Sequence, residues 1–152
     1  MNYLLDSNTV SDLYNRSSPL HEPIRRHLAT LTDEDNVYIS ILTLYEMEYG
    51  CANAPDDKQI AIRRQIQLLQ EDFRLLPLHP KAAFIFGTLK KNIQEDRQLS
   101  AKSIKQHNID IMIAANAILL NCKIVSEDKL FTALAKQDSR LHIENWSKMS
   151  TL

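Results

Sequence analysis

Short apolar runs alternate along the chain with longer segments whose apolar residues recur at helical spacing. Compact apolar runs predict strands, and apolar residues that recur every three or four positions predict amphipathic helices. We expect strands at 2–5, 37–40, 75–78, 123–126 and 142–144, and helices at 8–15, 21–31, 42–53, 57–73, 81–96, 109–121 and 128–136. This alternation predicts an α/β domain with a mainly parallel central sheet.

Breaks in the pattern refine this outline. Pro77 cannot donate to a strand ladder, so it predicts that the 75–78 strand lies at an edge of the sheet. The segment 97–108 is polar and basic, and we expect a loop there. Side chains that accept from free backbone N–H groups are expected at helix starts, namely Ser7 or Asn8, Asp56 or Asp57, and Asn108.

Length and composition fit one domain over residues 1–152, because 44% of the chain is hydrophobic and can form a core. No run of about 18 apolar residues is present, so no membrane span is expected. The chain does not open with a basic region followed by an apolar run, so no signal peptide is expected. Cys51 and Cys122 lie far apart. We expect both as reduced core thiols in a cytoplasmic protein.

The scarcity of glycine excludes several classes of enzyme. Gly50 and Gly87 are the only glycines, so neither a phosphate-binding P-loop nor a Gly-x-Gly-x-x-Gly dinucleotide turn can form. The five histidines show no His-Glu-x-x-His spacing, and no Gly-x-Ser-x-Gly nucleophile motif is present. Any catalysis must therefore depend largely on carboxylates.

Four acidic residues recur near strand ends or helix starts. Asp6 follows the first strand, Glu46 lies in the helix after the second, and Asp128 follows the fourth; Asp110 begins the apolar helix before that fourth strand. Parallel α/β folds bind ligands at the carboxyl ends of their strands, so the four can meet at one edge. Mg²⁺ and Mn²⁺ prefer such oxygen ligands, and a divalent ion offsets the repulsion of crowded carboxylates.

Two of these acids have a purely structural alternative as helix caps. Asp6 can cap the first helix, yet Ser7 and Asn8 can do the same, so we expect Asp6 to be spare for another role. Asp128 can cap the helix at 128–136, and Ser126 can serve there as well.

The other two acids also have structural alternatives. Asp110 lies in the first turn of an apolar helix, where a negative charge stabilises the helix dipole. Glu46 can be an ordinary surface glutamate; Glu48 points about 200° away on the same helix and cannot face the same site. Gly50 lies on the Glu46 side and leaves room near that carboxylate.

Positive charge is concentrated in residues 81–107, where six cations face two acids for a net +4. A solvated helix face explains this pattern, and so does a patch that binds a phosphate backbone. Lys102, Lys105 and His107 border Asp110 in sequence and are the candidates for such a patch.

Four stretches, in order along the chain, carry a resemblance to a known family. They are YLLDSN, ISILTLYEMEYG, NIDIMIAANAILLNCKIVSEDKLF and IENW. Together they resemble the PIN domain, and within it the VapC-like ribonuclease toxins of bacterial toxin–antitoxin pairs. The chain departs from the pattern at Ser126–Glu127, at the non-acidic Asn108 and in the loop SAKSIKQHN, which has no glycine.

The resemblance implies a three-layer α/β/α sandwich with a mainly parallel central sheet and one acidic metal site. It implies that Mg²⁺ or Mn²⁺ is held by Asp6, Glu46, Asp110 and Asp128, with Ser7 as a polar neighbour of Asp6 and Ser126 as a polar neighbour of Asp128.

The activity implied is metal-dependent hydrolysis of RNA phosphodiester bonds in tRNA, rRNA or mRNA, which inhibits translation and growth. Such a site needs no histidine or serine nucleophile, because the ion lowers the pKa of water and stabilises the phosphoryl transition state. Relatives form homodimers and bind a cognate antitoxin, whose basic side chain can enter the acidic site. Tyr14, Leu28, Leu31, Tyr45 and Tyr49 offer apolar surface for either contact.

Two other functions stay open. The chain can be a catalytically inactive PIN-like module that binds RNA or protein, although its complete acid set argues against that function. It can also be a DNA flap-type nuclease of related architecture, although such enzymes usually carry added DNA-binding elements.

Overall fold

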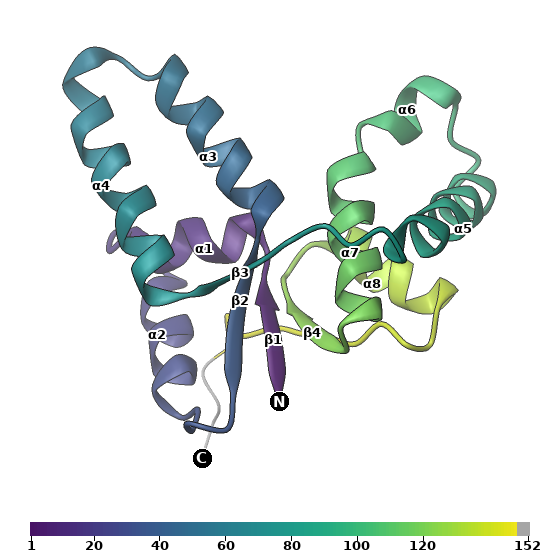
Figure 1. Ribbon diagram of the computed structural model, residues 1–152, viewed down its shortest axis with the longest axis horizontal. Coiled ribbons are helices and arrows are strands. Elements are labelled where there is room, and N and C mark those ends of the chain that lie inside the picture. Colours follow the sequence, from purple (N-terminus) through teal and green to yellow (C-terminus); the bar gives the residue numbers. More distant parts are fainter. Residues whose placement is uncertain (149–152) are drawn as a thin grey trace.

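The computed structural model describes residues 1–148 as a parallel five-stranded sheet with helices on both faces (Figure 1). The strands lie in the order β3-β2-β1-β4-β5, and every pairing between neighbours is parallel. Their bounds are β1 (Asn2–Leu5), β2 (Asn36–Ser40), β3 (Arg74–Leu76), β4 (Cys122–Val125) and β5 (Ile143–Glu144). The predicted parallel sheet is confirmed, with β3 at an edge as expected, although Pro77 lies just after this strand and not within it.

Each helix expected from the apolar spacing is present, within a few residues of its expected bounds. These are α1 (Ser7–Tyr14), α2 (His21–Ala29), α3 (Ile41–Asn53), α4 (Asp56–Asp72), α5 (Ala82–Asp96), α7 (Asn108–Leu119) and α8 (Lys129–Gln137). The prediction of a loop over 97–108 is wrong in part, because α6 (Ala101–Lys105) lies within it. Ser100 caps α6 by accepting from the Ser103 N–H at 3.0 Å, and the apolar Ile104 of this short helix is buried.

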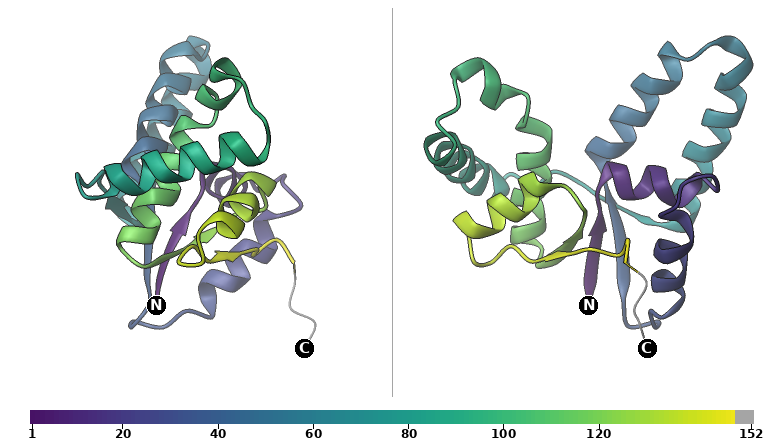
Figure 2. Two further views of the ribbon diagram at one scale, coloured as in Figure 1. Left: turned by 90° about the vertical axis from the view of Figure 1, so that its right-hand side faces the viewer. Right: turned by 180° about the vertical axis from the view of Figure 1, so that it is seen from behind.

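The sandwich has two cores because β1 is buried on both faces. Leu4 packs with residues of α5, α7 and α8, whereas Tyr3 and Leu5 pack with residues of α1, α2 and α4. Successive side chains of a strand point to opposite faces, so one central strand supports both layers. Figure 2 shows the two groups of helices on opposite sides of the sheet. The expected three-layer α/β/α architecture is confirmed.

The segment after β5 closes the second core. Trp146 is 2% exposed, and its ring stacks on His27 with centroids 4.2 Å apart and meets Tyr3 edge-on at 5.2 Å. Its Nε1 donates to Oε1 of Glu144 at 3.2 Å, so the indole N–H is satisfied. The IENW stretch is therefore a packing element rather than part of the acidic site.

Three of the expected helix caps are wrong. Asp6, rather than Ser7 or Asn8, is the N-cap of α1. Helix α4 follows Pro55 without a side-chain cap, and Asp56 lies in its first turn. His107 is the residue before α7, where Asn108 makes no capping bond.

Both cysteines are free and buried, as expected. Within residues 1–148, no helix is long and apolar enough to cross a membrane.

Candidate functional site

The register of the sheet brings the first two polar residues of the site together. Leu5 of β1 is paired with Val125 of β4, so the residues that follow, Asp6 and Ser126, lie side by side at the carboxyl edge. The backbone N–H of Asp6 donates to the carbonyl of Val125 at 3.1 Å and extends the ladder. Asp6 is 4% exposed and Ser126 is 3% exposed. Parallel pairing therefore places a carboxylate and a hydroxyl together in a buried position.

Asp6 combines a structural role with a place in the site. Its Oδ1 accepts from the Thr9 N–H at 2.8 Å and caps α1, while its Oδ2 accepts from the Ser126 hydroxyl at 2.5 Å. Burial raises the pKa of Asp6, and the charge of Asp128 raises it further, whereas the hydrogen bonds from Ser126 and Thr9 lower it. The expectation that Asp6 is spare is therefore wrong, because the cap uses one of its two oxygens.

Ser126 joins Asp6 to a second acid. Its Oγ accepts from the backbone N–H of Asp128 at 2.9 Å while it donates to Asp6. Asp128 is the N-cap of α8, and its Oδ1 accepts from the Leu130 N–H at 2.9 Å. Ser126 thus does not cap α8; it positions the turn that carries Asp128 beside Asp6.

Helix α3 contributes Glu46 through a pair of hydroxyls. The Ser7 Oγ donates to Oε1 of Glu46 at 3.1 Å and lies 3.1 Å from Oγ1 of Thr43, which is buried. Since Ser7 has a single hydroxyl proton, both bonds form together when Thr43 donates to Ser7. This gives a chain of hydroxyls from Thr43 through Ser7 to the carboxylate, and it fixes the exposed Glu46.

The charges of the other three acids all affect the pKa of Asp110. Burial raises the pKa of Asp110 to about 6, and the charges of Asp128, Glu46 and Asp6 contribute in that order. All four predicted acids therefore lie within electrostatic reach of one carboxyl group. Neutralising or ligating one of them relieves repulsion among the rest.

The carboxylates as they are placed do not form a ligand cage. Within residues 1–148, no group of three His, Cys, Asp or Glu side chains lies close enough together to hold a metal ion. Asp6 and Asp128 direct oxygens toward helix N–H groups instead. The donor set nevertheless fits a hard divalent ion in chemistry and in charge.

One further polar atom near this edge lacks a partner. Oδ1 of Asn108 is buried and accepts no hydrogen bond from any described residue. It lies in the first turn of α7, two residues before Asp110. An amide oxygen is a neutral ligand for a hard cation and an acceptor for its water, so this orphaned atom also fits a cation site.

Sequence reasoning missed Thr9 and Thr43, which support the acids from within the fold. Thr9 binds Asp6 through its backbone N–H and donates its hydroxyl to the carbonyl of Val125 at 3.1 Å. Thr43 lies one helical turn before Glu46, and this spacing is the signal that could have indicated its role. By contrast, Lys102 and Lys105 are exposed on α6, outside the hydroxyl and carboxylate network, and their predicted contact with nucleic acid stays a prediction.

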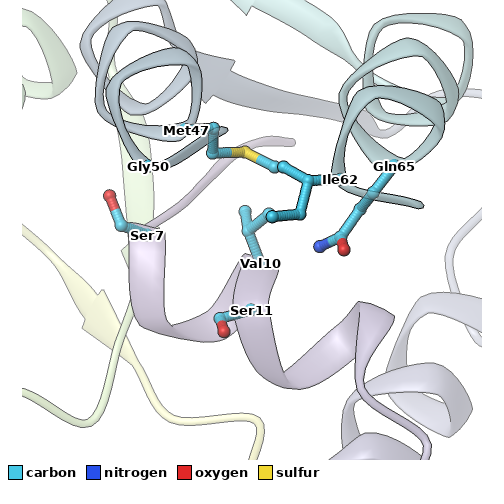
Figure 3. A pocket seen from close by; sticks show the side chains of 7 residues that line it. All are labelled: Ser7, Val10, Ser11, Met47, Gly50, Ile62 and Gln65. Carbon is cyan, nitrogen blue, oxygen red and sulfur yellow. The ribbon is translucent and has the colours of Figure 1, made fainter. Parts of the chain in front are cut away.

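A pocket of about 280 Å³ adjoins the acidic edge between α1, α3 and α4 (Figure 3). It is lined by Ser7, Val10, Ser11, Met47, Gly50, Ile62 and Gln65. The side chains of Val10, Met47 and Ile62 point toward one another, and the Gln65 amide extends toward α1. Ser7 belongs both to this pocket and to the hydrogen-bond network of Glu46.

Figure 1 shows the setting of the acidic edge. Strand β1 ends between the α3–α4 hairpin and the group formed by α5, α6 and α7. Glu46 comes from the first group and Asp110 from the second. The candidate acids therefore come from helices on both sides of the end of β1.

Comparison with known proteins gives a family and a fold. A model of the PIN domain matches residues 3–137. No curated protein matches the chain in sequence.

Solved structures of similar fold cover nearly the whole chain. A structure of VapBC2 from Rickettsia felis bound to a promoter DNA fragment matches at 22% identity and a TM-score of 0.74, over 96% of this chain and 99% of that chain. VapBC-1 from nontypeable Haemophilus influenzae matches at 21% identity and a TM-score of 0.75, over 97% of this chain and 100% of that chain. VapBC-5 from Mycobacterium tuberculosis is a member of the VapBC family of toxin–antitoxin systems. It matches at 20% identity and a TM-score of 0.62, over 95% of this chain and 96% of that chain. At these identities the likeness shows the fold.

Proposed function

The chain belongs to the PIN domain family, and from this premise we propose that it is a metal-dependent endoribonuclease and the toxin of a toxin–antitoxin pair. One observation carries the proposal: burial, together with the charges of Asp128, Glu46 and Asp6, raises the pKa of Asp110 to about 6. Such repulsion is costly in a protein without a compensating cation. A divalent ion that takes carboxylate oxygens is the ligand that this arrangement suits best.

The proposed ligands of Mg²⁺ or Mn²⁺ are Asp6, Glu46, Asp110 and Asp128, and hydrogen bonds from neighbouring residues orient two of them. Ser126 and Thr9 orient Asp6, and Ser7 orients Glu46. A bound ion supplies charge stabilisation for the phosphoryl transition state and lowers the pKa of water. The chain itself presents the carboxylates at one edge and keeps Asp6 buried, where electrostatic interactions are stronger than in bulk water.

RNA is the proposed substrate, and the basic side chains beyond the acids are its proposed contacts. Lys102 and Lys105 lie in the last turn of α6, and His107 follows one residue after that helix's C-cap. Cations there attract the phosphate backbone that the carboxylates repel.

A cognate antitoxin and a second copy of the chain are the proposed protein partners. Structures of similar fold are described as VapBC complexes and as a toxin–antitoxin system, which supports the first partner. A basic antitoxin side chain placed among the carboxylates would form charge-assisted hydrogen bonds and compete with the metal. Tyr45 and Tyr49 are 68% and 73% exposed on one stripe of α3 and offer apolar surface for either protein.

Titration calorimetry with Mn²⁺ tests the metal site. We expect the wild type to bind Mn²⁺ and Asp110→Asn to lose that binding. Asp56→Asn is the matched control, since it removes an equivalent charge from the first turn of α4, and it should bind as the wild type does. A wild type that binds no Mn²⁺ would leave the four acids with structural or surface roles alone and would contradict the proposal.

Cleavage of RNA tests the reaction with a variant that keeps the fold. Asparagine caps helices as well as aspartate does, so Asp6→Asn should retain α1. We expect it to lose about 100-fold or more in cleavage rate with Mg²⁺. Full activity in Asp6→Asn would remove Asp6 from the site, and RNA binding without cleavage by the wild type would favour the inactive binding module.

A further inference from the structure

The pocket between α1, α3 and α4 is lined by none of the proposed metal ligands. We propose that it binds one nucleobase of the RNA strand next to the cleaved phosphodiester and so selects the sequence that is cut. The inference rests on the proposed function. At about 280 Å³, the pocket lies just below the size of sites for drug-like ligands and suits a single ring system better than a longer segment.

The position of the pocket links it to the reaction. Ser7 lines the pocket and donates to Glu46 at 3.1 Å, so the pocket opens directly beside a proposed metal ligand. A phosphate held at the carboxylates has a base on each side of it along the strand. One of these bases can turn into the pocket while the phosphate stays at the acids.

The lining suits a neutral, flat and aromatic group. None of its seven residues carries a charge, so it offers nothing to a phosphate or an ammonium group. Met47 and Ile62, which are half-buried beside the buried Val10, supply apolar contact for a ring, and a methionine sulfur makes favourable contacts with aromatic rings. Proteins recognise single-stranded RNA by placing unstacked bases against such surfaces.

Gln65 distinguishes a base from an apolar side chain. Among the described residues, no hydrogen bond joins the Gln65 amide or the Ser11 hydroxyl to any partner. An amide presents a donor and an acceptor together, which matches the edge of a base. A purely apolar occupant would displace water from these groups without replacing its hydrogen bonds.

Gly50 provides a way to fill the pocket without disturbing the fold. A Cβ added at Gly50 meets no heavy atom within 4 Å. At 3.6 residues per turn, position 50 lies on the α3 face between Glu46 and Met47, so a longer side chain there extends toward the pocket. Gly87 in α5 is equally open to a Cβ and lies away from the pocket, which makes it a matched control.

The experiment is cleavage of a short single-stranded RNA pool of randomised sequence with Mn²⁺, followed by sequencing of the cut ends. We expect the wild type to prefer one base at a position beside the cut. Gln65→Leu removes the amide and Gly50→Leu fills the space, and each should reduce that preference about fivefold or more. Gly87→Leu should keep it.

Three outcomes would count against the inference in different ways. A wild type that cuts without base preference would overturn it. Variants that cut with the wild-type preference would also overturn it and would leave the pocket to an apolar side chain of a partner protein. A wild type that cuts no RNA would overturn the proposed function itself, which separates that failure from the other two.

Discussion

The hydroxyl of Ser126 donates to Oδ2 of Asp6 at 2.5 Å and, through the same oxygen, accepts from the Asp128 N–H at 2.9 Å. One side chain thus connects two acids that follow neighbouring parallel strands. The arrangement follows from the register that pairs Leu5 with Val125. A small hydroxyl residue after β4 is therefore as much a part of the acidic edge as the carboxylates are.

Removing that hydroxyl should destabilise the protein. Ser126→Ala leaves a buried carboxylate oxygen of Asp6 without its donor, and we expect a loss of about 1–2 kcal/mol in the free energy of unfolding. Ser126→Thr keeps the hydroxyl and is the control. Urea denaturation at neutral pH measures both. Equal stability of the alanine and threonine variants would show that the Ser126–Asp6 bond contributes nothing.

The raised pKa of Asp110 predicts how stability changes with pH in the metal-free protein. Its pKa is about 6 in the folded chain against an ordinary value of 3.8, so between these values the folded state binds more protons than the unfolded state. Stability contributed by this group is full below about pH 4 and is lost as the pH rises through about 6. Asp110→Asn should therefore be more stable than the wild type at neutral pH in EDTA.

The size of this effect is limited by the partial exposure of Asp110. The full difference in pKa corresponds to about 3 kcal/mol, and solvent screening reduces the expected gain to about 1 kcal/mol. Urea denaturation of wild type and Asp110→Asn at acidic and neutral pH measures it. With Mn²⁺ present, the wild type should instead be the more stable of the two proteins, because the ion stabilises only a protein that binds it. A variant that is less stable than the wild type in EDTA at neutral pH would contradict the raised pKa of Asp110.

The sequence predicted the sheet well because its signals are local. Runs such as YLL and KIV are short, apolar and rich in residues that suit buried strands, and each is followed by a polar residue. The four acids could be assigned to strand ends and helix starts from these runs alone. Besides burial, the charges of Asp128, Glu46 and Asp6 raise the pKa of Asp110, and a metal site shared by the four acids stays a prediction.

The parts that were not predicted depend on contacts distant in sequence or on competition between neighbours. Ser7 or Asn8 was expected to cap α1, but Asp6 caps that helix. The Ser7 hydroxyl bonds to Thr43 and Glu46 and not to Asp6, the neighbour expected for it. Propensity ranks both residues as good caps and cannot decide between them. Helix α6 was missed because a short polar helix is stabilised mainly by its cap and by the burial of Ile104.

Thr43 should act through Ser7 on the position of Glu46. Thr43→Val keeps the shape of the buried side chain and removes its hydroxyl, so Ser7 loses the donor that directs its own proton toward Glu46. We expect Mn²⁺ affinity by calorimetry to fall about tenfold, as is typical when a group that orients a metal ligand is lost. Thr43→Ser should restore it. If the Thr43→Val and Thr43→Ser variants bind Mn²⁺ with equal affinity, the hydroxyl chain does not position the Glu46 carboxylate.

The lysines of α6 should affect RNA binding through charge alone. Lys102→Ala and Lys105→Ala each remove one exposed cation, and we expect weaker binding of single-stranded RNA at low salt. The dependence of log affinity on log salt should become shallower by about 0.7 for each phosphate contact that is lost. Lys136→Ala removes a cation from the last turn of α8 and is the control. Fluorescence anisotropy with the inactive Asp6→Asn background measures affinity without cleavage. A slope that is unchanged in both α6 variants would leave Lys102 and Lys105 as solvated surface residues, because a lysine that neutralises no phosphate releases no counterion when RNA binds.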